Sequence, residues 1–410
     1  MPIRPPGSPP AYLPGPPGPP RPYGDPFIPA LSGILTSSAD SVVTVLPSAG
    51  SPWAADDAVF INQAWQYATA VRLIQGLTYN TLTPVLPPPG CALIGSGVGS
   101  AQSVNGLAAR TGAVIKPGPS WGSGGQPVSG AVTLLAGARQ GIRGVDIDCS
   151  SAPPAVDGIS LYGAVNATII EHVGVSAATG KGIGLYQDAS LNQPDGPQIS
   201  DSVISSPAGD GISGITVDMT AVNTHVQGAG GRAWYMNGNN CRLIACRADL
   251  SAHGFVTDTF YPAATAPGAT VLAGCGTQSN TGHGVWAANS SASGNVPRQP
   301  LIVTAGTFLE DGQDGASAAL QASGVASLIV SDSLVLANTT GPVYGVGTEK
   351  LGGSGPPLVQ VWGGFINALT ACVHDVGPAQ LLSYRFHGVQ GGAWNGNATP
   401  AAPSLFTLNS

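Results

Sequence analysis

The sequence predicts an all-β chain wound as a parallel β-helix, and three observations support this prediction. From about residue 130 onward, short β-branched segments recur between Gly, Asn, Asp and Ser residues. A glycine that introduces an apolar segment returns at unequal steps, at Gly158, Gly182, Gly211, Gly254, Gly284 and Gly315. Stacked coils contact only their neighbours and therefore tolerate turns of unequal length. A propeller would require a regular period, and a β-sandwich remains the alternative fold.

The composition fits a protein with a large core and few charges. Hydrophobic residues make up 43% of the 410 residues, so the chain does not have the composition of a disordered protein. The net charge of −7 disfavours nucleic-acid binding, which needs a basic surface. No apolar run approaches the length that spans a bilayer, and the first residues lack the apolar segment of a signal peptide. Neither membrane insertion nor a signal peptide is therefore expected.

Residues 1–30 hold over a third of the 37 prolines and are predicted to form an extended arm. Segments such as residues 15–20, with two Gly-Pro-Pro triplets, favour the polyproline II conformation. The arm would attach the chain to a larger assembly or lie beside its copies in a trimer. A tail without structure is the alternative.

Residues 31–125 are predicted to form a capping region with one amphipathic helix over residues 56–75. Asp56 and Asp57 favour a helix start, because aspartate caps free N–H groups and lies at the positive end of the helix dipole. Apolar residues then recur three and four apart, at Ile61, Ala64, Trp65, Ala68 and Val71. Gly76 would follow the end of the helix.

Residues 126–390 are predicted to form the β-helix, and residues 391–410 a C-terminal cap or subunit interface. A second strand signal precedes most of the repeated glycines, at residues 142–147, 168–175, 199–204, 243–250, 301–308 and 328–334. The last segment is uncharged and apolar, which suits a cover for the open strand edges of a solenoid. The six cysteines show no paired zinc spacing and are interpreted as buried reduced thiols.

The N-terminal part resembles that of pectate-lyase-like right-handed parallel β-helix proteins. The resemblance rests on the helix start at Asp56 and Asp57, the Leu-Pro-Pro-Pro-Gly segment 86–90, and the apolar strand 92–94 before a Gly-Ser-Gly sequence. It covers about residues 35–390. The group includes phage tail spikes and polysaccharide depolymerases, so the resemblance implies the fold and leaves several activities open. The proline-rich arm and the missing signal peptide favour a virion tail protein that is released by lysis.

Six titratable residues are predicted to lie in one column on the β-helix. If the repeated glycines align, the residues before them stack about 4.8 Å apart. The column is then Asp157, Lys181, Asp210, a glycine, His253, His283 and Asp314. Such a stripe would bind or cleave a sugar chain, with one of its members as a general acid. The alternative is that these residues only form turns, which Asp beside Gly commonly does.

Four aromatic residues are predicted to face outward from the coils. Tyr162 and Tyr186 follow aligned glycines at the same distance, and Trp234 joins them if Gly230 is its anchor. Trp286 lies two residues past Gly284. Alternation along a strand points these rings away from the inward isoleucines and leucines. The row would contact sugar rings, and contact with a neighbouring subunit is the alternative.

Cleavage of a polysaccharide would need two or three convergent carboxylates. The candidates in this acid-poor chain are Asp157, Asp210, Asp258, Glu310, Asp311 and Asp314, with His253 and His283 as further acid–base groups. The dense cluster Glu310, Asp311 and Asp314 is interpreted as a solvated turn, with a Ca²⁺ site as the alternative. No other metal and no cofactor is predicted. Gly282–Gly284 is similar to a polygalacturonase motif, but the acidic residues which that family pairs with it are largely missing.

The leading prediction is a bacteriophage tail spike or minor tail protein that binds a host surface polysaccharide. It would be a homotrimer, attached to other tail proteins through the arm and exposed on the virion. The sparse carboxylates favour binding over cleavage. One alternative is a polysaccharide depolymerase, a hydrolase or lyase, on the same scaffold. Another is a free bacterial β-helix protein with a structural or adhesive role.

Overall fold

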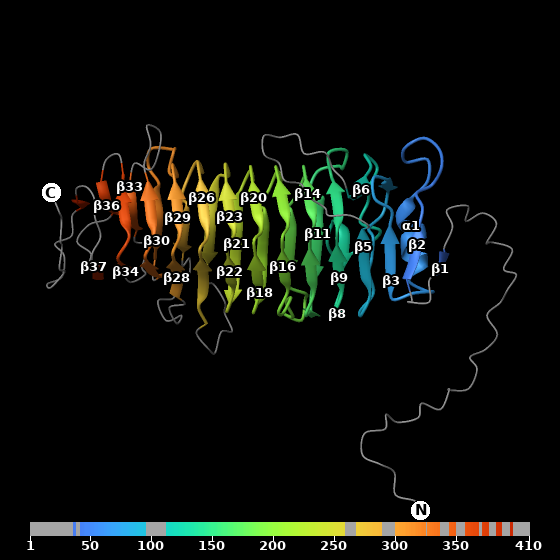
Figure 1. Cartoon of the computed structure of the whole chain (residues 1–410), viewed down its shortest axis with the longest axis horizontal. Coiled ribbons are helices and arrows are strands. Elements are labelled where there is room, and N and C mark those ends of the chain that lie inside the picture. Colours follow the sequence, from blue (N-terminus) through green and yellow to red (C-terminus); the bar gives the residue numbers. More distant parts are fainter. Residues whose placement is uncertain are drawn as a thin grey trace, which may run out of the picture.

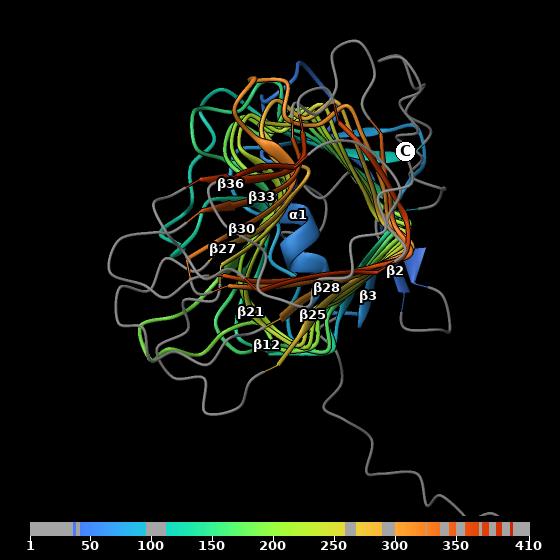
Figure 2. The same ribbon diagram turned by 90° about the vertical axis from the view of Figure 1, so that its left-hand side faces the viewer.

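The predicted parallel β-helix is confirmed by a computed structural model of the chain (Figure 1). It describes residues 36–37, 42–95, 112–258, 268–288, 300–324, 326–336, 344–349, 357–368, 371–376, 383–387 and 394–396. Within these residues, three long sheets run side by side along the molecule and enclose one interior (Figures 1 and 2). The predicted arm, residues 1–30, and most of the segment 391–410 lie outside the described residues.

Each of the three sheets contains one strand from each of successive coils, and within a sheet the strands lie in the order of the chain. Sheet A contains β1 (Thr36–Ser37), β2 (Val42–Val45), β3 (Ala70–Leu73), β5 (Ala92–Gly95), β9 (Gly141–Arg143), β13 (Ile169–Glu171), β16 (Gln198–Ser200), β19 (Thr220–Val222), β22 (Arg242–Ile244), β25 (Thr270–Ala273), β28 (Pro300–Thr304), β31 (Ser327–Ser331), β34 (Leu358–Trp362) and β37 (Ser383–His387). Sheet B contains β4 (Thr78–Thr81), β6 (Ala113–Pro117), β10 (Val145–Asp148), β14 (Gly174–Ser176), β17 (Val203–Ser205), β20 (His225–Gln227), β23 (Arg247–Asp249), β26 (Gly276–Gln278), β29 (Thr307–Leu309), β32 (Leu334–Leu336) and β35 (Phe365–Asn367).

Sheet C completes the coils. It contains β7 (Gly130–Leu134), β11 (Asp157–Tyr162), β15 (Ile183–Tyr186), β18 (Ile212–Val217), β21 (Arg232–Asn239), β24 (His253–Asp258), β27 (Val285–Ala288), β30 (Ala318–Ser323), β33 (Tyr344–Glu349), β36 (Ala371–Val376) and β38 (Trp394–Gly396). A small extra sheet pairs β8 (Gly137–Ala138) with β12 (Val165–Asn166). Within the described strands, β1 and β2 pair antiparallel and every other named pair is parallel.

The turns between sheets A and B follow one rule, which explains their small and polar residues. A two-residue turn joins each strand of sheet A to the next strand of sheet B from β13 onward, and its first residue has a positive φ between 47° and 65°. These residues are His172, Asp201, Asn223, Ala245, Gly274, Ala305, Asp332 and Gly363. Asn, Asp and Gly tolerate this left-handed conformation better than other residues. The repeated turn therefore keeps successive coils in register.

Gly158, Gly182, Gly211, Gly254 and Gly284 mark the corner where a coil enters sheet C, whereas Gly315 lies in the turn before β30. Steric space explains the glycines at the corner. A Cβ atom on Gly158 would lie 2.3 Å from Val175, and one on Gly182 would lie 2.3 Å from Ile204. Both neighbours are buried core residues of sheet B. The repeat is thus a requirement of the interior, because only glycine leaves room for a branched side chain opposite.

The core fills the space between the three sheets. In sheet C the inward column runs through Ile159, Ile183, Ile212, Trp234, Phe255 and Val285, all of them buried. The Trp234 and Phe255 rings stack with their centroids 5.9 Å apart. At the N-terminal end, α1 (Asp57–Ala64) lies across the interior when the molecule is viewed along its length (Figure 2). It buries Ala58, Ile61 and Ala64 against the first coils.

The helix is shorter than the predicted range 56–75. Asp56 caps it as expected, since its carboxylate accepts the N–H of Ala58 at 3.1 Å. The helix ends at Ala64, and the apolar residue Val71 belongs instead to β3, where inward and outward residues alternate. Gly76 lies in the turn that follows β3, with φ +74°. β3 pairs with β2 and β5 although its apolar spacing would also fit a helix. The stacked strand buries the same apolar residues and gives its backbone N–H and C=O groups hydrogen-bond partners.

Stacked strands begin with β2, so the coils extend N-terminal of residue 126, where the repeats become visible in the sequence. Among the described residues, no helix is long and apolar enough to span a membrane.

Candidate functional site

A column of titratable residues lies at or just before the start of successive strands of sheet C, and we call this column the ladder. Its members are Asp157, Lys181, Asp210, Arg232, His253 and His283, one from each of six successive coils. Backbone bonds fix the order: the N–H of Gly158 bonds to Lys181, that of Gly182 to Asp210, and that of Gly211 to Arg232. Because Gly158, Gly182 and Gly211 lie against core side chains of sheet B, the ladder residue before each of them is on the outward-facing side of its strand.

Two places in the ladder differ from the predicted column. Arg232 takes the fourth place, where the sequence suggested a glycine, because Ala233 stands at the glycine position of that coil. Val226 lies opposite Gly211, and Ala248 follows Val226 in register on sheet B, so Ala248 takes the place opposite Ala233. Its side chain is small enough to leave room for the methyl group of Ala233. After His283 the column continues with Ala318 and not with Asp314. Asp314 lies in the preceding turn, where its carboxylate accepts the N–H groups of Ala316 and Ser317.

The Asp157 carboxylate is buried and holds three hydrogen bonds. It accepts the backbone N–H of Lys181 at 2.7 Å, the hydroxyl of Ser160 at 3.0 Å and the hydroxyl of Tyr186 at 2.5 Å. Burial raises the pKa of Asp157 above its usual value, although the hydrogen bonds oppose this shift. Burial and the neighbouring Asp157 charge also raise the pKa of Tyr186, so its phenol stays protonated. Tyr186 is thereby locked across Gly184, where a Cβ atom would lie 2.3 Å from the ring.

The Asp210 carboxylate two coils away is bound by Arg232. The guanidinium donates through Nε at 3.0 Å and Nη2 at 2.8 Å, and the Arg232 backbone N–H adds a third bond at 2.8 Å. Ser213 donates a fourth at 2.7 Å. Burial alone would raise the pKa of Asp210, but these donors outweigh it and lower the pKa. Asp210 is therefore ionised, in a different environment from Asp157.

The cations of the ladder lie against tyrosine rings. Lys181 Nζ is 4.4 Å from the centroid of the Tyr186 ring, and Arg232 Cζ is 3.6 Å from that of Tyr235. Burial lowers the pKa of Lys181, and the charges of Asp157 and Asp210 oppose that shift. Tyr235 was absent from the predicted site. Its signal in the sequence is its position, since it shares a register column with Ser213 and, through Val256, with Trp286.

Two histidines and a tryptophan form the far end of the ladder. The rings of His253 and His283 stack at 5.5 Å, and Trp286 lies 5.4 Å from the first and 5.0 Å from the second. The backbone N–H of His283 donates to His253 Nδ1 at 3.1 Å, which requires an unprotonated nitrogen there. Burial lowers the pKa of His283 to about 4 and also lowers the pKa of His253. Both imidazoles are therefore neutral at neutral pH.

The predicted aromatic row needs one correction. Trp234 does not face outward: it is fully buried and its indole stacks on Phe255 in the core. The prediction counted from Gly230, whereas the strand aligns Trp234 with Ile212, an inward residue. Tyr162 and Tyr186 are half-buried and pair in register, and Trp286 is half-buried and donates through Nε1 to Ser323 at 3.0 Å. Asp258 is the last residue of β24. Burial is the main cause that raises the pKa of Tyr235, and the negative charge of Asp258 adds to it.

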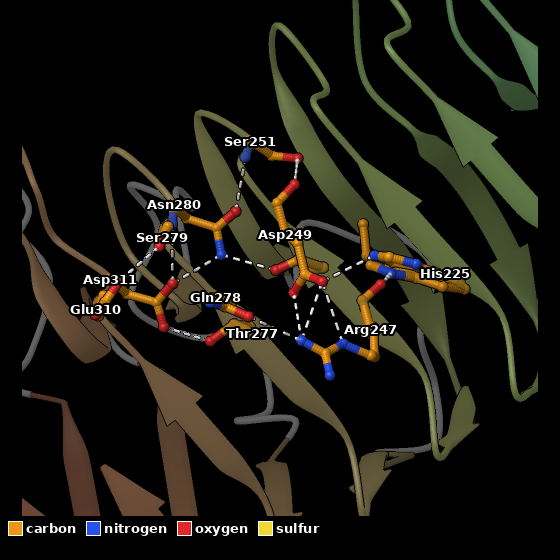
Figure 3. A network of polar contacts seen from close by, with 12 residues as sticks. His225, Arg247, Asp249, Ser251, Thr277, Gln278, Ser279, Asn280, Glu310 and Asp311 are labelled. Carbon is orange, nitrogen blue, oxygen red and sulfur yellow. Dashed lines mark hydrogen bonds and ion pairs between the residues drawn. The ribbon is translucent and has the colours of Figure 1, made fainter. Parts of the chain in front are cut away.

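The acidic cluster of residues 310–314 does not form a site on the surface. Asp311 lies inside the coil, fully buried, and accepts the Thr277 hydroxyl and the backbone and side-chain N–H groups of Asn280 (Figure 3). Burial raises the pKa of Asp311 to about 7. Glu310 accepts the Ser279 hydroxyl at 3.0 Å and Asp314 serves its own turn. The three carboxylates have separate partners, and no group of three metal-ligating side chains occurs among the described residues. The calcium alternative is not supported.

A cluster on sheet B was missed at the level of sequence. His225 Nε2 lies 2.9 Å from the Asp249 carboxylate, which also receives Arg247 Nη2 at 3.1 Å (Figure 3). Arg247 reaches Gln278 of the next coil at 3.4 Å. These residues come from three successive strands, β20, β23 and β26, and carry no local motif. They come together because β20, β23 and β26 pair in register, and this register could not be predicted from the sequence of sheet B.

Comparison with known proteins places the fold. No family profile and no curated protein matches the sequence. Among solved structures, the A-module of mannuronan C-5 epimerase AlgE4 from Azotobacter vinelandii is similar at a TM-score of 0.63 and 16% identity, over 87% of this chain and 98% of that one. The catalytic domain of GH87 alpha-1,3-glucanase is similar at 0.62 and 13%, over 90% of this chain and 69% of that one.

A third similar structure is the enzymatically active domain of tailspike protein 2 from bacteriophage CBA120. Its TM-score is 0.55 at 10% identity, over 76% of this chain. The present chain spans less than half of that tailspike chain, 45%. At these identities the likeness concerns the fold. The chain therefore has the fold of a right-handed parallel β-helix.

Proposed function

We propose that this protein binds a polysaccharide along sheet C, with the ladder and its aromatic neighbours as the binding surface. The observation that carries the proposal is the uninterrupted run of polar and aromatic groups from Asp157 to Trp286. Asp157 and Asp210 each accept three or more hydrogen bonds, and the cations Lys181 and Arg232 lie over tyrosine rings, so the surface is held in place before a ligand arrives. Such preorganisation reduces the entropy lost on binding.

The spacing of the ladder suits a chain-like ligand. Adjacent coils are about 4.8 Å apart, so Tyr235 and Trp286, two coils apart, are separated by about 10 Å. Successive sugar rings of an extended glycan could therefore contact successive aromatic rings. Sugar hydroxyls would bond to the outer atoms of Lys181, Arg232 and the histidines. Each such hydrogen bond contributes about 0.5–1.5 kcal/mol, and a long contact sums many of them.

The setting that fits these features best is the tail spike of a bacteriophage, a homotrimer that recognises a host surface polysaccharide. Support comes from the shared fold with a phage tailspike and with enzymes whose names refer to polysaccharides. In this proposal residues 1–30 attach the spike to other tail proteins. Solution mass by light scattering, with and without these residues, tests the trimer: a monomer in both forms counts against it.

Cleavage is the second candidate function, and one observation favours it. The environments of Asp157 and Asp210 move their pKa values apart, which is the usual sign of an acid and a base. Their strands lie two coils apart, about 10 Å, close to the separation in inverting glycosidases of about 6.5–9.5 Å. Against cleavage, both carboxylates already hold three or more donors.

One experiment separates the two functions. The full chain is screened against bacterial surface polysaccharides, and hits are measured by calorimetry together with release of reducing ends and unsaturated products. Tyr235→Ala combined with Trp286→Ala should weaken binding about 100-fold, from about tenfold for each lost ring. Tyr67→Ala, an exposed aromatic on the N-terminal cap, is the matched control. Binding without product supports a receptor-binding protein. Product that disappears in Asp210→Asn supports a depolymerase, and no binding to any polysaccharide overturns both.

A further inference from the structure

A hollow lies on the outer face of sheet B at the N-terminal end of the molecule. It has a volume of about 470 Å³ and is lined by Thr78 and Asn80 of β4, Val114 and Lys116 of β6, Asp148 of β10, and Pro52, Trp53, Gly76 and Gly112. Small-molecule sites commonly enclose about 300–1,000 Å³, so this hollow is in the lower half of the range. None of its lining residues belongs to the ladder.

The polar groups of the hollow lie on three neighbouring strands of sheet B and form one wall. Asp148 Oδ1 accepts the backbone N–H of Ser150 at 3.1 Å, and a carboxylate has lone pairs for further donors. Lys116 Nζ and Asp148 Oδ2 are 3.7 Å apart, too far for a direct hydrogen bond between them. Their side chains are 29% and 12% exposed. Asn80 uses its backbone N–H for Asp57, and no hydrogen bond joins its side-chain amide to another described residue. The wall therefore offers donors and acceptors side by side.

Trp53 adds an aromatic side chain to the lining of the hollow. The Trp53 indole lies against Gly118, where a Cβ atom would come within 2.5 Å of the ring. Trp53 itself has a φ of 60°, a conformation that bulky residues rarely adopt. The lining thus combines an indole with amide, ammonium and carboxylate groups, which matches the apolar and polar surfaces of a sugar ring.

We propose that this hollow is a second carbohydrate site that binds one neutral pyranose ring. The Lys116 and Asp148 charges offset each other, so the site offers no net attraction to an anionic sugar. The C–H face of the ring would pack on Trp53. Its hydroxyls would bond to Asn80, Lys116 and Asp148, which together can both donate and accept. A site for a single ring at one end of the coil would bind a chain terminus or a branch, independently of the ladder.

The experiment uses the full chain and a panel of methyl glycosides of glucose, galactose, mannose and N-acetylglucosamine, with methyl glucuronide as the anionic member. Saturation-transfer NMR identifies binders and calorimetry measures them. We expect at least one neutral glycoside to bind with a Kd of about 1 mM, typical of a few hydrogen bonds and one ring contact. Asn80→Ala should weaken it about tenfold. Thr78→Trp should abolish it, because Thr78 is exposed at the hollow and an indole would fill the space.

Controls distinguish this site from the ladder and from misfolding. Gln198→Trp places the same indole on an exposed position of sheet A and should leave glycoside binding unchanged. Trp286→Ala removes a ladder ring and should also leave it unchanged, while weakening polysaccharide binding if the proposed function holds. Loss of binding in Trp286→Ala would assign the glycoside to the ladder and overturn the second site. The proposal is equally overturned if no neutral glycoside binds saturably, if Thr78→Trp binds like Gln198→Trp, or if methyl glucuronide is preferred.

Discussion

The Tyr186 hydroxyl donates to the Asp157 carboxylate of the preceding coil at 2.5 Å, and this bond couples two rungs of the ladder. Asp157 is buried, and without Tyr186 its Oδ2 would keep only the Ser160 hydroxyl as a donor. The bond therefore has a structural role as well as a role in presenting the Tyr186 ring to the outside. Variants of these two residues are the most direct test of how the surface is built.

Replacing Tyr186 with Phe should destabilise the protein without changing its fold. The ring still covers Gly184, but the buried Asp157 loses a donor, which costs about 1–3 kcal/mol. The free energy of unfolding from urea titration measures the change. Tyr162→Phe is the matched control, because it lies in the same register column one coil away. Equal stability of the two variants would show that the short bond contributes nothing.

The bond between Arg232 and Asp210 should be the strongest single contact of the ladder. Arg232→Ala leaves the Asp210 carboxylate without its bidentate partner. Since the Arg232 side chain is 34% exposed, we expect a loss of about 1.5–3 kcal/mol, below the cost at a fully buried pair. A double-mutant cycle with Asp210→Asn isolates the coupling. A coupling energy near zero would contradict the assignment.

Trp234 and Trp286 should respond in opposite ways to truncation. Trp234→Ala empties a core position beside Phe255 and should cost about 3–5 kcal/mol of stability. Trp286→Ala should change stability much less and should weaken polysaccharide binding instead. Thermal unfolding and calorimetry on both variants give the comparison. Strong destabilisation by Trp286→Ala together with unchanged binding would remove it from the proposed surface.

Asp311 should make the protein less stable as pH rises. Its pKa is about 7 in the folded chain and about 3.9 when unfolded, so the folded state binds the proton more tightly. The stability due to this proton is complete below pH about 4 and is lost as pH rises to about 7. Asp311→Asn should remove that slope, because the amide carries no charge at any pH. Melting temperatures of both forms between pH 4 and 8 test this, and parallel curves would refute it.

His283 should make the protein more stable as pH rises over the same pH range. Its pKa is lowered to about 4 in the folded chain, against about 6.5 when unfolded, so protonation favours the unfolded state. The stability that it contributes above pH 6.5 is lost as pH falls toward 4. His283→Gln in the Asp311→Asn background should flatten the remaining slope. An NMR titration that finds the His283 imidazole protonated at pH 6 would contradict the prediction.

The sequence predicted the parts of the ladder that follow the repeated glycine. Asp157, Lys181 and Asp210 stand before glycines whose Cβ positions are filled by core side chains, so the pattern in the sequence reports a real steric requirement. The prediction was wrong where the requirement is relaxed. In the coil of Ala233 the facing residue is Ala248, and alanine replaces glycine without a clash. The count from Gly230 then moved Trp234 to the outer face, because a shift of a strand's register exchanges its two faces.

The sequence by itself determined the solenoid, the inward isoleucines of sheet C and most of the order of the ladder. These depend on local rules that repeat in most coils: a glycine at the corner, a left-handed residue in the turn, and alternation along the strand. Only the tertiary structure decided that Asp311 lies inside the coil, that His225 meets Asp249, and that Trp53 and Lys116 line one hollow. These pairings join residues from different coils and from different turns. Their positions depend on how the coils stack, because loops of unequal length separate them along the chain.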